Sequence, residues 1–561
     1  MRALRIFGIV VGCIIVVLIA AVVALQLLVH PNDYKGRIEA AVKSSTGRDL
    51  SLPGNIHLAI FPALAVEFGP ATLGNPPGFP AAQPFASIQR ASLRVHLLPL
   101  LHRQLVVGRV EIDGLDLRLL KNAQGQGNWS MPAGKTPTPA AQASGSPMTL
   151  GGVAGVLVKK SRVSYQDMVA DHVDVNIGHV ATGVPVPVKW SLDLTTGPGA
   201  RPIPLSGNAT LEYSANAAHL SGLDARIDDS TLRGTAAVTN LTTGAMSFDL
   251  SINHIDLDRY LAASKSSSAA ARSAPPAGTA QSQQPTELPT SGLKTLQMNG
   301  KLAIGSAKVY GMKLSQVDVG LAADGGVLHI SPATAELYGG SSTGSVTLDA
   351  HGAVPVLQLD ESLAGVNVQP LLEDFAKLNR VSGRGNVTLN VTATGKTTTA
   401  LLRSLNGHAA VNLTNGAIAG LDLWSAVNSA VALVQKHSLP TGGMGNSTRF
   451  DAFKASADLT NGVASTKDLD IASGDLHVTG QGTTNLVTGA VNYRVNATIL
   501  KGATAGAALA SVPLLISGTM TSPTVRPDTQ ALVKSVARQQ LEKHKGQIEN
   551  KLRNVLKGFI H

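Results

Sequence analysis

Alternation of apolar and polar residues with a period of two is the dominant pattern of this 561-residue chain. In one run the apolar positions are Val387, Leu389, Val391 and Ala393, alternating with Asn386, Thr388, Asn390 and Thr392. A second run has Val491, Tyr493, Val495, Ala497 and Ile499, with polar or charged residues between them. Successive side chains of a strand point to opposite faces, so each run predicts a strand with one apolar and one wet face. The fold class predicted is mainly β.

The same period recurs earlier in the chain, and helical patterns are few. Between residues 86 and 120 the apolar positions are Val110, Ile112, Leu115, Leu117 and Leu119. Helical spacing of Tyr34, Ile38 and Val42 predicts a short helix over 32–43, with Asn32 or Asp33 as its N-cap. Two further helices are expected at 370–377 and at 421–436, the latter after a turn at Gly420.

An uncharged segment near the N-terminus, residues 6–29, is long enough to cross a membrane. As a helix it would rise about 36 Å at about 1.5 Å per residue. A cleaved signal peptide is the alternative, but its apolar region is shorter and ends in a small-x-small cleavage site. The run instead continues through Leu25, Leu27, Leu28 and Val29, which favours an uncleaved, single-pass anchor. Basic residues lie on both sides of it, so charge alone does not settle its orientation.

Composition divides the chain into seven segments. Two of the boundaries are stretches rich in Pro, Ala, Ser and Gly, which predict a flexible loop and a disordered linker. The expected segments are an anchor at 1–30, a β region with a short helix at 31–131, a flexible loop at 132–152, a middle β region at 153–262, a disordered linker at 263–291, a second large β region at 292–527 and a tail at 528–561.

The tail has a basic, amphipathic helical pattern. Its apolar residues recur at helical spacing, at Leu532 and Val536 and then at Ile548, Leu552, Val555, Leu556 and Phe559. Packing against the rest of the protein is one interpretation of this pattern, and contact with a membrane surface is the other.

Composition and charge limit the classes of partner that the protein is expected to bind. The formal net charge is +10, but no basic cluster is interleaved with aromatic residues, so we expect no binding of nucleic acid. Contact with anionic lipid is the better use of this charge. The single cysteine, Cys13, lies within the apolar segment, which fits an exported domain that forms no disulfide.

Three patterns that could carry chemistry fail on their context. Gly340-Ser341-Ser342-Thr343-Gly344 matches a nucleophile elbow, but strand-like residues follow it where that motif needs a helix, so a hydrolase at Ser342 is a distant alternative. Gly395-Lys396-Thr397 and Gly134-Lys135-Thr136 lack the earlier glycine of a phosphate-binding loop. The histidines are scattered, so the sequence predicts no metal site, no cofactor and no catalysis.

An ordered series of short motifs resembles the AsmA family of bacterial envelope proteins over nearly the whole chain. The N-terminal motifs are Thr46-Gly47-Arg48-Asp49-Leu50, Asn75 to Phe79, Gly125 to Trp129 and Asp256 to Leu261. The C-terminal ones are Leu337-Tyr338-Gly339-Gly340, Pro370-Leu371-Leu372, Ser404 to Gly407, Asn415 to Leu423, Asn461-Gly462-Val463 and Gly518 to Pro523. Thr466-Lys467-Asp468 and the low-complexity stretches depart from the family pattern.

The resemblance implies an inner-membrane anchor and a long, mostly periplasmic antiparallel sheet curled into a groove. It implies phospholipid transport between the inner and outer membranes, or outer-membrane maintenance. On this basis the expected lipid-facing positions are Val387, Leu389, Val391, Val491, Tyr493 and Val495. Alternation alone does not distinguish a lipid groove from a closed sandwich of two sheets. The alternative function is therefore an assembly factor for outer-membrane proteins, which would bind protein surfaces and conduct no lipid.

Overall fold

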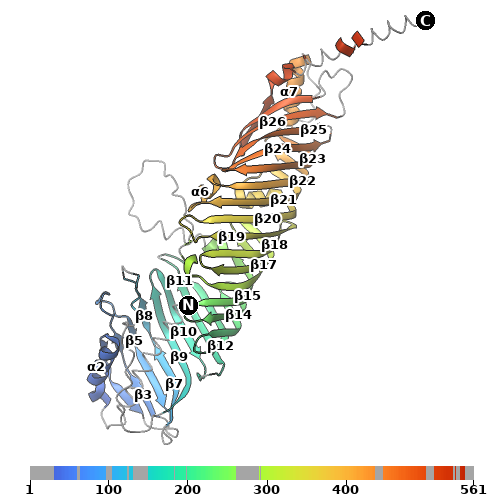
Figure 1. Ribbon diagram of the computed structural model, residues 1–561. Coiled ribbons are helices and arrows are strands. Elements are labelled where there is room, and N and C mark those ends of the chain that lie inside the picture. The colour runs from blue at the N-terminus through green and yellow to red at the C-terminus, as the bar shows by residue number, and fades with distance from the viewer. Residues whose placement is uncertain are drawn as a thin grey trace, which may run out of the picture. The chain divides into compact units, whose positions relative to one another are not determined.

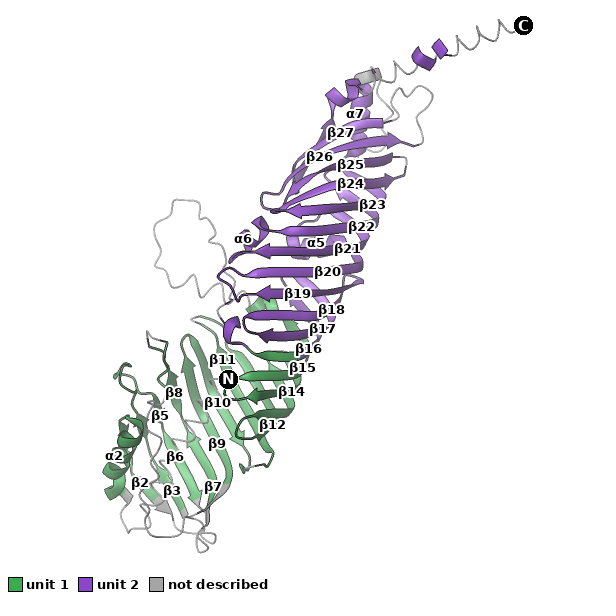
Figure 2. Ribbon diagram, viewed as in Figure 1, with its two compact units in different colours: residues 1–277, 297–300 green, residues 278–296, 301–561 purple. Residues whose placement is uncertain are grey.

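The computed structural model describes residues 31–59, 64–95, 104–122, 125–129, 149–181, 183–197, 199–260, 290, 292–435, 446–474, 476–500, 511–534, 537, 544–546 and 548–549. Within this part the protein is mainly β, with antiparallel pairing almost throughout and few short helices (Figure 1). The chain forms two compact units, residues 1–277 with 297–300 and residues 278–296 with 301–561 (Figure 2).

The described part of the first unit begins with two helical segments, η1 (Pro31–Tyr34) and α2 (Lys35–Thr46), before its strands. The first eight strands are β1 (Leu50–Ser51), β2 (Ile56–Ala59), β3 (Leu64–Phe68), β4 (Ala71–Leu73), β5 (Ala86–Ile88), β6 (Arg90–Val95), β7 (Gln104–Asp113) and β8 (Asp116–Leu119). They are followed by β9 (Thr149–Tyr165), β10 (Met168–Ile177), β11 (Val186–Thr195), β12 (Ile203–Tyr213), β13 (Ala218–Ile227), β14 (Ser230–Asn240) and β15 (Ala245–Asp256). β9 runs parallel to β7 and β8, whereas its pairing with β10 and the pairing of the other described strands of this unit are antiparallel.

The apolar positions predicted between residues 86 and 120 form the core of this unit. Val110, Ile112, Leu115, Leu117 and Leu119 are all buried, and they cluster with residues of β3, β6 and β9. The intervening charged residues are only partly buried. The predicted one-faced strands are therefore confirmed here.

Three of the family motifs meet around the fully buried Asn128. Its side-chain amide donates to Asn75 Oδ1 (2.9 Å) and to the Arg118 carbonyl (2.8 Å), and its Oδ1 accepts from the Leu120 N–H (2.9 Å). The buried Arg48 donates to the Asn128 carbonyl (2.7 Å), and its guanidinium lies 4.4 Å from the centre of the Phe85 ring. These residues are far apart in sequence. Their hydrogen bonds within the core account for the residue types at these motif positions without a functional role.

The first helix is present, but its predicted cap is wrong. α2 begins at Lys35 after a turn of 3₁₀-helix, and its N-cap, Tyr34, forms no side-chain capping bond. Asn32 Oδ1 instead accepts from the Ile56 N–H (3.0 Å), so this side chain holds the helix to β2. The helix also continues to Thr46, where Gly47 adopts a positive φ of 71° and ends it.

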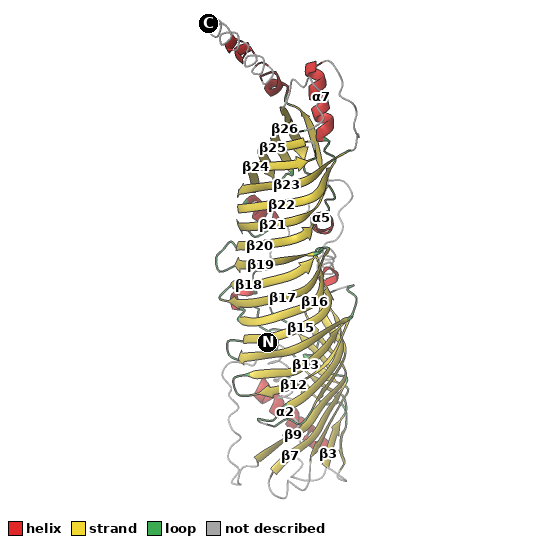
Figure 3. Ribbon diagram, turned by 90° about the vertical axis from the view of Figure 1, so that its right-hand side faces the viewer, coloured by secondary structure: helices red, strands yellow, loops and turns green. Residues whose placement is uncertain are grey.

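The described part of the second unit is a run of antiparallel strands with a few short helices (Figure 3). After η2 (Leu293–Thr295) comes β16 (Met298–Val309), whose residues up to Gly300 belong to the first unit. The strands that follow are β17 (Met312–Asp324), β18 (Val327–Leu337), β19 (Gly340–Asp349), β20 (Val356–Asn367), β21 (Val381–Thr394), β22 (Asn406–Ala419), β23 (Ser447–Thr460), β24 (Val463–Ser473), β25 (Leu476–Asn485), β26 (Ala490–Ile499), β27 (Ser511–Thr519) and β28 (Ser522–Pro527). Each strand from β17 to β28 pairs with the next along the chain.

Three α-helices lie between described strands of this unit, α5 (Val368–Ala376), α6 (Thr398–Arg403) and α7 (Leu423–Gln435). The first and last agree with the two helices predicted from the sequence to within about two residues at each end. α6 was not predicted; the Thr397 side chain caps it by accepting from the Ala400 N–H (3.2 Å).

The predicted tail helix lies partly within the described residues, whereas the predicted membrane segment does not. The described part of the tail is helical, with Leu532 buried in the core and Val533 and Ile548 exposed. The predicted membrane segment, residues 6–29, lies outside the described residues. Among the helices that are described, none combines the length and apolarity needed to cross a membrane.

Candidate functional site: an apolar sheet face

The six expected lipid-facing residues lie on one face of the second unit's sheet. Directly opposed residues of an antiparallel pair share a face, so the register can be followed from strand to strand. Val391 opposes Gly407, which opposes Leu459, then Ala464, Thr484 and Val491 in turn. Tyr493 and Val495 follow Val491 at intervals of two. We call this side of β18–β28 the apolar face.

The middle of the apolar face is half-exposed. On β21, Val387 and Leu389 are partly buried and Val391 is 6% exposed, whereas Asn386, Thr388 and Asn390 on the other face are exposed. Aliphatic neighbours continue this surface at partial exposure, namely Val346, Leu348, Leu357, Leu359, Leu363, Ala409, Val411, Ala455 and Ala457. The predicted alternation is therefore present, and its apolar side is accessible along several neighbouring strands.

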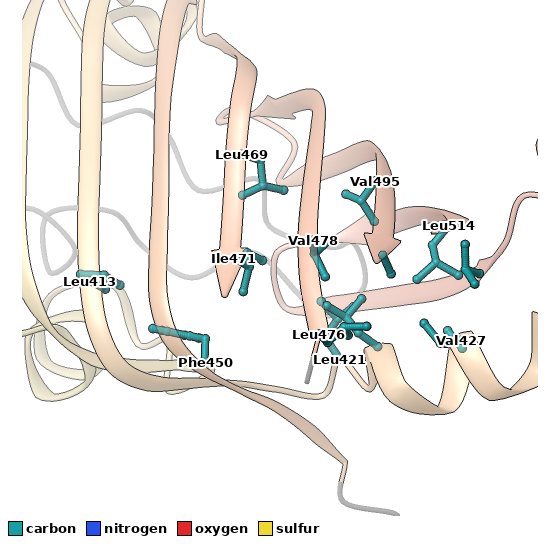
Figure 4. Close-up of a cluster of buried hydrophobic side chains, with 14 of the residues drawn as sticks. Leu413, Leu421, Val427, Phe450, Leu469, Ile471, Leu476, Val478, Val495 and Leu514 are labelled. Atoms are coloured by element: carbon teal, nitrogen blue, oxygen red, sulfur yellow. The ribbon is translucent and has the colours of Figure 1, made fainter. Parts of the chain in front are cut away.

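At the C-terminal end the apolar face is closed by α7. Leu423, Val427 and Val431 of this helix are buried in a cluster with Val478, Val495 and Leu514. Figure 4 shows Val427 directed toward the strands that carry Val495 and Leu514, and Leu421 beside Leu476. Val495 is 2% exposed, so the structure places it in a packed core, while Val491 and Tyr493 keep partial exposure.

One margin of the apolar face is also covered by α5. Val368 is buried in the same cluster as Val366, Leu337 and Leu413, and Leu371 packs against it. In Figure 3, α5 and α7 both lie along this margin of the strands. The covered part of the face is thus one margin and the C-terminal end, and the accessible part lies along the centres of β19–β23.

The landmark Tyr338 fixes α5 in this position. Tyr338 has a positive φ of 48°, and its hydroxyl donates to Asp374 Oδ2 (2.8 Å) on α5 and accepts from the Lys313 N–H (3.2 Å). Burial and then the bond to Asp374 raise the pKa of the Tyr338 phenol, which therefore stays a neutral donor. A mainly polar cavity of about 540 Å³ lies beside it, and Lys313, Ser315, Glu336 and Ser341 contribute to its lining.

Polar groups interrupt the apolar face near β26 and on β20. Near β26 the Tyr493 hydroxyl lies 3.0 Å from Thr484 Oγ1 and 3.5 Å from Thr466 Oγ1. On β20 the Glu361 carboxylate accepts a hydrogen bond from Ser342 Oγ (2.7 Å). Sequence reasoning missed Glu361, although its odd-numbered position between Leu359 and Leu363 is the signal that places it on the apolar side.

The structure offers no nucleophile elbow at Ser342. This residue lies inside β19, which continues for seven residues beyond it to Asp349, and its hydroxyl bonds a carboxylate and not a histidine. Thr397 of the glycine-lysine-threonine stretch serves as the α6 cap, and residues 134–136 lie outside the described part. Across the described chain, no group of three His, Cys, Asp or Glu side chains is placed to hold a metal ion.

The fold and its apolar face define a mainly β protein with a long antiparallel sheet and few helices. Residues 1–191 and 201–469 match the AsmA family, and the chain belongs to that family. It is 22% identical to Protein AsmA of Escherichia coli (strain K12) over 524 residues, covering 84% of each chain. No solved structure matches the chain.

Proposed function

We propose that this protein binds phospholipid acyl chains on the apolar face and acts in phospholipid transport between the inner and outer membranes. Its setting would be the cell envelope, with the chain held in the inner membrane by residues 6–29 and its bulk in the periplasm. The observation that carries the proposal is the run of half-exposed aliphatic side chains across β19–β23, on strands whose opposite face is polar.

The physical case rests on the burial of acyl chains. Each buried methylene contributes about 0.8 kcal/mol, so a sixteen-carbon chain gains up to about 12 kcal/mol before entropy costs. The accessible centre of the face has mostly Val, Leu, Ala and Gly, which offer a smooth surface with few directional contacts. Such a surface suits sliding of a chain better than tight binding of one ligand.

The margin of the apolar face that α5 and α7 cover favours the alternative function, an assembly factor, for that part of the face. Where α5 and α7 pack on the strands, the apolar side chains are satisfied by the protein itself and need no lipid. If the remaining exposed centre also binds protein, the assembly-factor function follows instead. Lipid retention on the full chain distinguishes the two functions.

The test compares two aspartate substitutions on neighbouring positions of β21. Leu389→Asp places a charge on the half-exposed apolar face, and Thr388→Asp places the same charge on the exposed polar face. We expect the full chain, extracted mildly and analysed by lipid mass spectrometry, to retain phospholipid in the wild type and in Thr388→Asp. Leu389→Asp should lose most of this lipid while its circular dichroism stays unchanged.

Either of two results would count against the proposal. Equal lipid in both variants would mean that the lipid is held elsewhere, for example around residues 6–29. A folded, lipid-free wild type would mean that the face closes on protein, and capture of outer-membrane assembly components would then favour the second function.

A further inference from the structure

Glu361 is a lone carboxylate within the apolar face. Among the registered pairs of β18–β22 that share this face, every other side chain is aliphatic, glycine or serine. Glu361 opposes Leu389 on one side and Gly344 on the other, with Leu359 and Leu363 next to it along the strand. Within the described residues no basic side chain forms an ion pair with it.

The neighbouring strand is shaped to accept this carboxylate. Ser342 donates to Oε1 at 2.7 Å. A Cβ on Gly344 would lie 2.4 Å from the Asp360 carbonyl oxygen and 2.5 Å from Glu361 Oε2, so a larger residue there would displace both the neighbouring backbone and the carboxylate. The side chain therefore lies across β19 in space that a glycine leaves free. One hydrogen bond leaves most of the acceptor positions of a carboxylate unfilled.

Covering the Glu361 carboxylate with acyl chains costs free energy, because the carboxylate then loses its contact with water. A carboxylate removed from water needs a partner charge or several hydrogen bonds, and a hydrocarbon chain supplies neither. An ammonium group supplies both, since it carries a positive charge and N–H donors in the same group. A second anion would be repelled, and the repulsion grows as water leaves the site.

We propose that Glu361 is a head-group site that selects phospholipids with a primary ammonium, such as phosphatidylethanolamine, over anionic phosphatidylglycerol. The inference rests on the proposed function, because it assumes that acyl chains occupy the apolar face. In the bound state the ammonium donates to the carboxylate, and the acyl chains lie on the aliphatic surface around Leu359, Leu389 and Ala409.

The test is a competition between the two lipids on the full chain. Detergent-purified protein is equilibrated with mixed micelles that contain equal amounts of phosphatidylethanolamine and phosphatidylglycerol, and native mass spectrometry identifies the lipid that stays bound. Leu389→Asp defines the part of the signal that comes from the apolar face. Wild type should favour phosphatidylethanolamine there by roughly threefold to tenfold, the range of one charge-assisted hydrogen bond partly screened by water.

Four variants separate head-group selection from an effect on folding. Glu361→Gln should bring the ratio near one without reducing total lipid, and Glu361→Lys should reverse the preference. Asp360→Asn removes a charge from the exposed face of the same strand and should leave the ratio unchanged. Ser342→Ala removes the hydrogen bond to Glu361 but keeps the carboxylate, so it should preserve the preference. This variant still tests the site if Glu361→Lys fails to fold.

The outcomes distinguish this inference from the function on which it rests. Bound lipid with the same head-group ratio in wild type and Glu361→Gln would overturn the head-group site and leave lipid binding in place. Absence of lipid from the apolar face in the wild type would overturn both.

Discussion

Substitution of Asn128 should lower the stability of the first unit, because this buried side chain connects several of its segments. Replacing it with alanine removes two donated hydrogen bonds and leaves the Leu120 N–H without its acceptor inside the core. Buried polar groups left without partners cost about 1–3 kcal/mol each, so Asn128→Ala should destabilise this unit by about 2–4 kcal/mol. Amide exchange in β8 should accelerate by about 30-fold or more.

The control for this prediction is Asn208→Ala, because Asn208 is an exposed asparagine of β12. Its effect on exchange in β8 should be negligible. Similar exchange in both variants would show that the network around Arg48 and Asn128 is dispensable.

Asp468 gives a pH dependence whose sign is set by its hydrogen bonds. The Ser456 N–H (2.8 Å) and hydroxyl (2.7 Å) both donate to its carboxylate and lower its pKa. The unfolded value is about 3.9, so this contribution to stability is complete above that pH and is lost as the pH falls through the lower, folded pKa. Asp468→Asn should therefore be less stable than the wild type at neutral pH, with the difference shrinking in acid.

Urea unfolding at a series of pH values measures this difference. Glu373→Gln, at an exposed position of α5, removes a carboxylate as the control and should give a difference that does not follow the same curve. A constant gap between wild type and Asp468→Asn down to pH 2 would contradict the assignment.

At the scale of elements, α7 is the part that decides how much of the apolar face is open. Val427 is completely buried against the sheet, and Val427→Ala removes two methyl groups from that contact. The loss of burial and the remaining cavity should cost about 2 kcal/mol. Loosening of α7 should also expose Val495 and Leu514, and so increase the binding of the dye 1-anilinonaphthalene-8-sulfonate.

Ser425→Ala tests the same helix on its exposed side. This change should leave both stability and dye binding close to wild type, since alanine is a good helix former. Dye binding that is equal in the two variants would mean that α7 does not cover the strands in solution.

The elements themselves followed from the sequence wherever one physical rule decided the outcome. The alternation at 386–393 is confirmed because a half-buried strand has no other arrangement that separates Val391 from Asn390. α5 and α7 are confirmed because their apolar spacing changes abruptly from two to between three and four.

Features set by distant partners could not be predicted. The cap at Asn32 was wrong because the same side chain bonds equally well to a strand more than twenty residues away. The Thr466-Lys467-Asp468 departure is a β-bulge, with the register shifting between Thr466 and Leu469, and bulges have no periodic signal. Likewise, periodicity shows that Val495 faces an apolar side but not that α7 covers it.

At the scale of the whole molecule, the match to the AsmA family extends over 1–191 and 201–469, and the formal net charge of the chain is +10. The match includes residues of both units, so both units carry the sequence pattern of the family. Val387 and Leu389 remain candidates for lipid contact, because their partial exposure is unaccounted for by the packing of α5 or α7. The tail then raises a separate question, since it is basic and begins directly after the last strand.

The tail combines an attached beginning with an exposed continuation. Asp528 caps its first turn by accepting from the Ala531 N–H (3.0 Å), and Leu532 is buried in the core. Ile548, further along, is 57% exposed. Residues 537–561 contain six Lys or Arg and two Asp or Glu, a formal net charge of +4 from the difference. Packing on the protein accounts for the start of the tail, and we propose membrane contact for the remainder.

A chain that ends at Lys534 should therefore fold normally and bind anionic membranes less well. Basic residues near an anionic surface contribute about 1 kcal/mol each at low ionic strength, so the lost charge corresponds to up to about 4 kcal/mol. The full chain, inserted into neutral liposomes through residues 6–29, should tether anionic liposomes, and high salt should abolish the tethering because it screens the charge. The shortened chain should tether few liposomes at any salt concentration. Equal tethering by both chains would leave packing on the protein as the role of the tail, because the surviving membrane contact would then belong to the sheet.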